Sequence, residues 1–160
     1  MSIPAINSTL IVLAIIALAT LYGAIAGTSR LRSLILSVYV GIVLSNQLSA
    51  VVAPFAKSLG SDQISLLLFV LPILLFGFSL GKQNGHDRGA LVFRLLLGLL
   101  TGALIVSAGI NVLPPSQAQD VINGSFVAMN LNQFHLWLVA LLPLFVLIGP
   151  LFRKKSRSHH

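Results

Sequence analysis

The chain has 160 residues, of which 56% are hydrophobic and only 8% are charged. Soluble domains carry roughly 25% charged residues, so a water-facing globule is excluded and the composition predicts an integral membrane protein. The net charge of +7 would suit a nucleic-acid partner in a soluble protein, but here the basic residues collect at helix ends and in a short tail, so no nucleic acid is expected.

Five apolar segments are long enough to cross a bilayer, because about 20 apolar residues span about 30 Å of hydrocarbon. In chain order they are residues 8–27, 34–53, 63–81, 90–113 and 134–152. The expected fold class is therefore an all-α integral membrane protein, a bundle of about five transmembrane helices. Residues 1–152 form its single transmembrane domain, and residues 153–160 form a basic tail.

The first segment has a second interpretation, because Ala24-Ile25-Ala26 resembles the cleavage site of a signal peptide. Basic residues follow this segment rather than precede it, which favours a retained helix. Pro72 and Pro143 lie near the middle of the third and fifth segments. Because proline removes a helical donor, we expect kinks there and neighbouring helices that satisfy the freed carbonyls.

The Lys and Arg residues divide unequally between the two sides that five crossings create. With the N-terminus outside, nine of the ten fall on the cytoplasmic side: Arg30, Arg32, Lys82, Arg88, Arg94, Arg153, Lys154, Lys155 and Arg157. Only Lys57 falls outside. Since cytoplasmic loops carry an excess of basic residues, this imbalance predicts an external N-terminus and a cytoplasmic C-terminal tail that anchors the last helix or attracts anionic lipid.

The longest connection, residues 114–133, is external and nearly uncharged. Val121, Ile122 and Phe126 are among the residues that make it too apolar for a free linker. We expect it to lie on the membrane surface or to fold over the helix ends as a short helix.

Small residues recur every four positions from just before the second segment through it: Ser29, Ser33, Ser37, Gly41, Ser45 and Ser49. The same spacing relates small residues in the other segments: Ala19, Gly23 and Gly27, then Gly77 and Gly81, then Gly98 and Gly102. Small residues let helices approach closely in lipid, where hydrophobicity does not distinguish protein from solvent. Two interpretations stay open, namely packing within one small bundle and an interface with other copies or partner subunits.

Asn46 and Gln47 form an amide pair in the outer half of the second segment. Each amide needs a hydrogen-bonding partner inside a membrane. The pair is expected to bond to a neighbouring helix, and the alternative is a polar pore or a site for a polar substrate.

Ionisable residues are nearly absent from the apolar segments. The chain has no Glu, and its three Asp residues fall in expected loops. Asp87 and Arg94 are about two helical turns apart and are expected to form a cytoplasmic ion pair. His135 stands alone at the outer end of the fifth segment, where a hydrogen bond is expected rather than a metal. With no cysteine and no catalytic motif, the sequence predicts no enzyme, no metal and no cofactor.

Two stretches, GAIAGTSRLRSLILSVYVGIVLSNQLS at residues 23–49 and GHDRGALVFRLLLGLLTGALIVSAGI at residues 85–110, resemble the colicin V production protein family. The first has the glycine- and arginine-containing turn between two spans, and the second has the Asp-Arg pair, Asp87-Arg88, before a glycine-rich span. The fifth segment and the basic tail depart from that family's four-span outline. The resemblance implies a protein of the bacterial inner membrane, linked to export or envelope maintenance.

Two functional hypotheses follow. The first is a non-enzymatic structural or accessory subunit whose small-residue faces pack against copies of itself or other membrane subunits within the lipid bilayer. The alternative is a small oligomeric channel or transporter lined by polar residues of the second segment.

Overall fold

The computed structural model describes residues 5–52, 54, 60–77 and 91–154, and every element in these ranges is helical. The elements are α1 (Ala5–Val52), α2 (Ser61–Pro72), a π-helical turn η1 (Ile73–Gly77), α3 (Leu91–Val112), α4 (Pro115–Gly124), α5 (Phe126–Gln133) and α6 (His135–Lys154). The expected all-α class is confirmed for this part of the chain.

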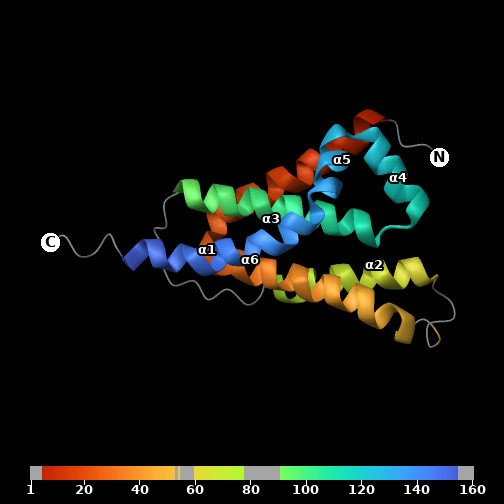
Figure 1. The fold of residues 1–160 in the computed structure, drawn as a ribbon, viewed down its shortest axis with the longest axis horizontal. Coiled ribbons are helices and arrows are strands. Elements are labelled where there is room, and N and C mark those ends of the chain that lie inside the picture. Colours follow the sequence, from red (N-terminus) through yellow and green to blue (C-terminus); the bar gives the residue numbers. More distant parts are fainter. Residues whose placement is uncertain (1–4, 53, 55–59, 78–90, 155–160) are drawn as a thin grey trace.

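Helix α1 is broken at Gly27, which has φ 80° and ψ 171°. This conformation is open almost only to glycine, because a Cβ would collide with the backbone. The break divides α1 into a first arm, residues 5–26, and a second arm, residues 28–52, which fold back on each other as a V (Figure 1). Residues 28–33, which lie between the first two expected spans, are helical, because helix resumes directly after Gly27.

The third expected segment begins slightly earlier than predicted, at Ser61, and its residues 78–81 lie outside the described residues. Its helix changes from α to π geometry directly after Pro72. Proline has no N–H to donate to the carbonyl four residues earlier, and local π adjustments are among the ways in which membrane helices tolerate this loss. The irregularity expected at Pro72 is this change from α to π geometry.

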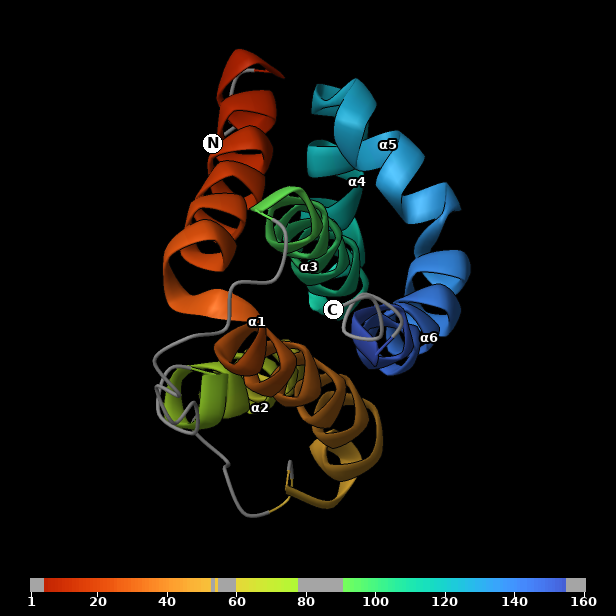
Figure 2. The ribbon, with the colours of Figure 1, turned by 90° about the vertical axis from the view of Figure 1, so that its left-hand side faces the viewer.

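Helix α3 is the central element (Figure 2). It lies between the first arm of α1 and the α5–α6 segment, and ten of its residues are buried. Its apolar side chains belong to two clusters. One includes Leu31, Val38, Phe69, Leu97, Leu104 and Leu142, and the other comprises Val12, Val106, Ile110 and Ala128.

The 114–133 connection forms two short helices, α4 and α5, rather than one. Ser125 ends α4 and caps α5, since its Oγ accepts from the Ala128 N–H at 3.3 Å. Ala128 is fully buried against α1 and α3, so this connection does fold over the helix ends. Between α5 and α6 the chain bends by 70°. The large bend in this part of the chain is therefore at Phe134. No break in α6 occurs at Pro143, where a kink was expected, because α6 continues as one helix through that residue.

By length and composition, two helices of the described residues can cross a membrane: the two-armed α1, from Ser8 to Val52, and α3. A third candidate arises if α5 and the following part of α6 form one bent span, and Ser61–Gly77 is a shorter apolar helix. The start of α1 and the end of α6 lie toward opposite ends of the long axis (Figure 1). The break in α1, the start of α3 and the end of α6 all lie toward the same end.

Candidate functional site

The closest approach between two elements occurs where the first arm of α1 crosses α3. A Cβ at Gly98 would lie 2.9 Å from the carbonyl oxygen of Ala19, and one at Gly102 would lie 2.8 Å from the Cα of Ile16. On the facing helix, a Cβ at Gly23 would lie 3.1 Å from the Cα of Gly98. Because these neighbours are backbone atoms, any larger side chain must push the helices apart. These glycines make their contacts within the chain.

The middle of the serine–glycine stripe in the second arm of α1 is also used internally. A Cβ at Gly41 would lie 2.6 Å from the carbonyl oxygen of Phe69 in α2. Ser37 and Ser45 are buried, and their hydroxyls donate to carbonyls of their own helix at 2.7 and 3.0 Å. The outer members of the stripe are exposed or half-buried: Ser29, Ser33 and Ser49.

Two glycines of the predicted contact set differ from the others. Nothing lies within 4 Å of a Cβ built at Gly27, so this residue serves the backbone break rather than a helix contact. Gly77 approaches the side chain of Leu34, at 2.7 Å from a built Cβ, whereas Gly81 lies outside the described residues.

Asn46 and Gln47 lie on the outer face of the second arm and are exposed. No side-chain hydrogen bond joins either amide to another described residue. The same face carries exposed apolar side chains: Leu36, Val40, Val43 and Val51, with exposed fractions between 38% and 63%. The amide pair therefore interrupts an apolar surface without a partner among the described residues.

Arg94 binds the end of the first arm of α1. Its Nη1 donates to the carbonyl oxygen of Ala24 at 3.2 Å, and its Nε is buried without a hydrogen-bond partner. Ala24 lies in the last turn before Gly27, where the break removes the N–H partners of the carbonyls. A guanidinium at such a helix C-terminus both caps the carbonyl and interacts favourably with the helix dipole. Asp87, the expected ion-pair partner, lies outside the described residues, so that pair stays a prediction.

His135 is hydrogen-bonded, as expected, and its partner is a residue of α3. The Oγ of Ser107 and the Nδ1 of His135 lie 2.6 Å apart. Asn111 donates to the Ser107 carbonyl at 2.8 Å and to the Oδ1 of Asn132 at 3.4 Å. This polar cluster joins α3, α5 and α6 where the chain bends. Ser107 is 0% exposed, so its hydroxyl fixes the bend and is not open to a substrate.

Tyr39 bridges the second arm of α1 to α6, and no sequence pattern pointed to it. Its hydroxyl donates to the carbonyl oxygen of Val139 at 2.5 Å. Val139 lies four residues before Pro143, so its carbonyl is the one that loses its helical donor to the proline. The expectation of a neighbour that satisfies this carbonyl is met by Tyr39.

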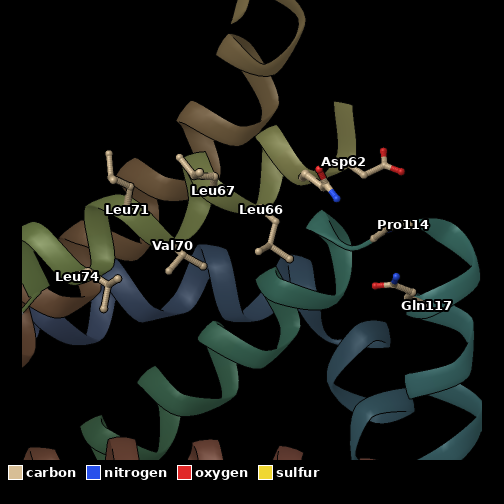
Figure 3. A pocket seen from close by; sticks show the side chains of 9 residues that line it. Asp62, Leu66, Leu67, Val70, Leu71, Leu74, Pro114 and Gln117 are labelled. Carbon is tan, nitrogen blue, oxygen red and sulfur yellow. The ribbon is translucent and has the colours of Figure 1, made fainter. Parts of the chain in front are cut away.

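A groove of about 410 Å³ lies between α2 and the junction of α3 with α4 (Figure 3). Its lining residues from α2 and η1 are Asp62, Gln63, Leu66, Leu67, Val70, Leu71 and Leu74, and those from the junction are Pro114 and Gln117. The polar side chains lie at one end and the apolar ones along the remainder. The sequence carries one local signal of this groove, the change from polar to apolar residues after Gln63, and that signal alone does not predict it.

Within the described ranges, no three His, Cys, Asp or Glu side chains lie close enough together to hold a metal ion. No protein-family model, no curated protein and no solved structure matches this chain. The resemblance to the colicin V production protein family therefore stays a prediction.

Proposed function

We propose that this chain is a non-enzymatic membrane subunit that assembles with copies of itself through the outer face of the second arm of α1. The observation that carries the proposal is the exposed amide pair Asn46 and Gln47 on an otherwise apolar face. An amide facing lipid leaves its donors and acceptors unsatisfied, whereas an amide facing the same amide in a second copy satisfies both. A two-fold axis brings one patch onto itself, so it needs no second binding surface.

Five crossings are part of the proposal. At 1.5 Å per residue, the two arms of α1 measure about 33 and 37 Å, and α3 and α6 measure about 33 and 30 Å. The Ser61–Gly77 helix measures about 26 Å by the same rise and crosses with local thinning of the bilayer. The break in α1, the start of α3 and the end of α6 lie toward one end of the long axis (Figure 1). Arg30, Arg94 and Arg153 lie close to these places in the sequence, which supports the cytoplasmic assignment of that end. The bacterial inner membrane is the location that the family resemblance favours.

The small-residue stripes support this assembly less directly than the sequence suggested. The closest glycine contacts, at Gly23, Gly98 and Gly102, are made inside the chain and fix the shape of one protomer. Of the polar residues of the second span that could line a pore, Ser37 and Ser45 are buried, so only part of that lining, including Asn46 and Gln47, is exposed. A self-associating subunit is therefore favoured over the channel.

Native mass spectrometry of the chain in mild detergent tests the proposal. The wild-type chain should be a homo-oligomer, and the double variant Asn46→Leu with Gln47→Leu should dissociate more readily. At roughly 1 kcal/mol for each interhelical amide, the dissociation constant should rise about tenfold or more, since 1.4 kcal/mol is a factor of ten.

Gln119→Leu is the matched control, because Gln119 is an exposed amide in α4, away from the proposed interface. It should leave the stoichiometry unchanged. A monomeric wild-type chain in lipid, or a double variant that dissociates no more readily than the control, would contradict the proposal.

A further inference from the structure

The groove beside α2 has a polar end, which we call the mouth, formed by Asp62, Gln63 and Gln117, and an apolar remainder, which we call the stem, formed by Leu66, Leu67, Val70, Leu71 and Leu74. This arrangement matches the shape of an amphiphile. Asp62, Leu66, Val70 and Leu74 recur every four residues and therefore share one helical face, with Gln63, Leu67 and Leu71 beside them. The opposite face of α2 is committed to the protein interior through the buried Ile64 and Phe69. The groove face is therefore the part of α2 that remains open to the surroundings.

The apolar stem is suited to hydrocarbon rather than water. Leu67 is 50% exposed and Leu74 is 61% exposed, so the side chains of the stem are available for contact. Twelve residues separate Asp62 from Leu74, a rise of about 18 Å. One leaflet supplies about half of the 30 Å hydrocarbon core. The stem is long enough for a single acyl chain lying parallel to α2.

The mouth selects for a hydrogen-bond donor with positive charge. The Oδ1 of the Asp62 carboxylate accepts a hydrogen bond from the Ser61 hydroxyl at 3.3 Å. Among the described residues, no Lys or Arg is paired with Asp62. Gln63, the next residue in α2, and Gln117 of α4, on the other side of the groove (Figure 3), add amide donors and acceptors. A primary ammonium offers three donors and a charge to the carboxylate, while the amides suit ester and phosphate oxygens.

We infer that this groove binds a phospholipid whose headgroup carries a primary amine, such as phosphatidylethanolamine. One acyl chain lies along Leu66, Val70 and Leu74, and the ammonium contacts Asp62. An anionic headgroup without an amine is repelled by the carboxylate, and a trimethylated amine lacks the N–H donors. The site lies on α2 and α4, whereas the proposed self-association uses the outer face of the second arm of α1.

Lipid retention measured by native mass spectrometry tests the inference. The purified chain is incubated with phosphatidylethanolamine, phosphatidylcholine and phosphatidylglycerol of identical acyl chains. The wild-type chain should retain the ethanolamine lipid about tenfold more strongly than the other two, the scale of one charge-assisted hydrogen bond. Asp62→Asn should abolish this preference while keeping acyl-chain binding. Because Asp62 is exposed at the first turn of α2, this variant leaves the core intact.

A second variant tests the stem. Val70→Trp should fill the groove and remove retention of all three lipids, while Leu18→Trp, on the exposed surface of the first arm, should not. Equal retention of the three lipids by the wild-type chain would overturn the inference. Disulfide cross-linking of Leu66→Cys between copies, in this cysteine-free chain, with no lipid retained, would show a second copy as the occupant and would also overturn it. Neither result depends on the Asn46 and Gln47 interface.

Discussion

At the scale of single residues, two prolines illustrate how apolar helices accommodate a missing donor. After Pro72 the backbone changes to a π turn. At Pro143 the helix is continuous, and the carbonyl of Val139 instead accepts from the hydroxyl of Tyr39, one hundred residues away in sequence. The sequence predicts that such a carbonyl needs a donor, because the fault is local. Only the packing of α6 on α1 decides which residue supplies it.

The Tyr39 hydroxyl should therefore matter only while Pro143 is present. Tyr39→Phe leaves the Val139 carbonyl without a donor and should destabilise the chain by about 1–2 kcal/mol, the cost of an unsatisfied buried acceptor. In a Pro143→Ala background residue 143 has its own N–H, and the same substitution should cost much less. Denaturant unfolding of the four chains forms a double-mutant cycle. Equal costs in the two backgrounds would show that Tyr39 does not serve this carbonyl.

At the scale of elements, spacing identifies the glycines that allow close packing but not the pairs that they form. The four-residue repeats of Gly23 with Gly27 and of Gly98 with Gly102 look alike in the sequence. In the structure Gly23, Gly98 and Gly102 meet a neighbouring backbone, and Gly27 forms the break between the two arms of α1. The residue type is the same because both roles exclude a Cβ, so the sequence alone does not separate them.

A pair of substitutions in α3 tests the packing contact. Gly98→Ala places a Cβ 2.9 Å from the Ala19 carbonyl oxygen and from the Cα of Thr20, so the two helices must separate. Overpacking of this kind should destabilise the chain by about 1–3 kcal/mol. Gly109→Ala, in the same helix, meets nothing within 4 Å and should be neutral or slightly stabilising. Thermal unfolding in detergent provides the comparison, and similar melting temperatures for the two variants would contradict this account of the contact.

At the scale of the whole molecule, basic residues lie in the sequence next to the helix ends that the fold brings to one end of the molecule. Arg30 and Arg32 follow the break in α1, Arg94 begins α3, and Arg153 and Lys154 end α6. These three places lie toward one end of the long axis, and α4 and the start of α2 lie toward the other (Figure 1). A bilayer normal along this axis separates them onto two sides.

Single-cysteine labelling tests the proposed orientation, because the chain has no cysteine of its own. In intact cells, Gln117→Cys should react with a membrane-impermeant maleimide, whereas Ser29→Cys should react only after permeabilisation. Both positions are exposed, so a difference in labelling reflects the side of the membrane. Labelling of both positions from the same side would rule out the five-span path.

The sequence by itself determined the all-α class and the apolar helices, because transfer of backbone and side chains into hydrocarbon depends on composition and length. It also located Gly98, Gly102, Asn46 and Gln47, whose residue types are unusual for their surroundings. It left residues 28–33 between two expected spans, whereas in the structure helix resumes directly after Gly27, whose positive φ alone turns the chain.

Only the tertiary structure decided which surfaces are already occupied. The burial of Ser37 and Ser45, the Ser107–His135 bond and the groove beside α2 all join residues distant in sequence. For a helix face in lipid, a protein neighbour and a lipid neighbour are equally apolar. The pairing of helices therefore depends on shape and on hydrogen bonds between elements. Those are properties of the assembled bundle and not of any one segment.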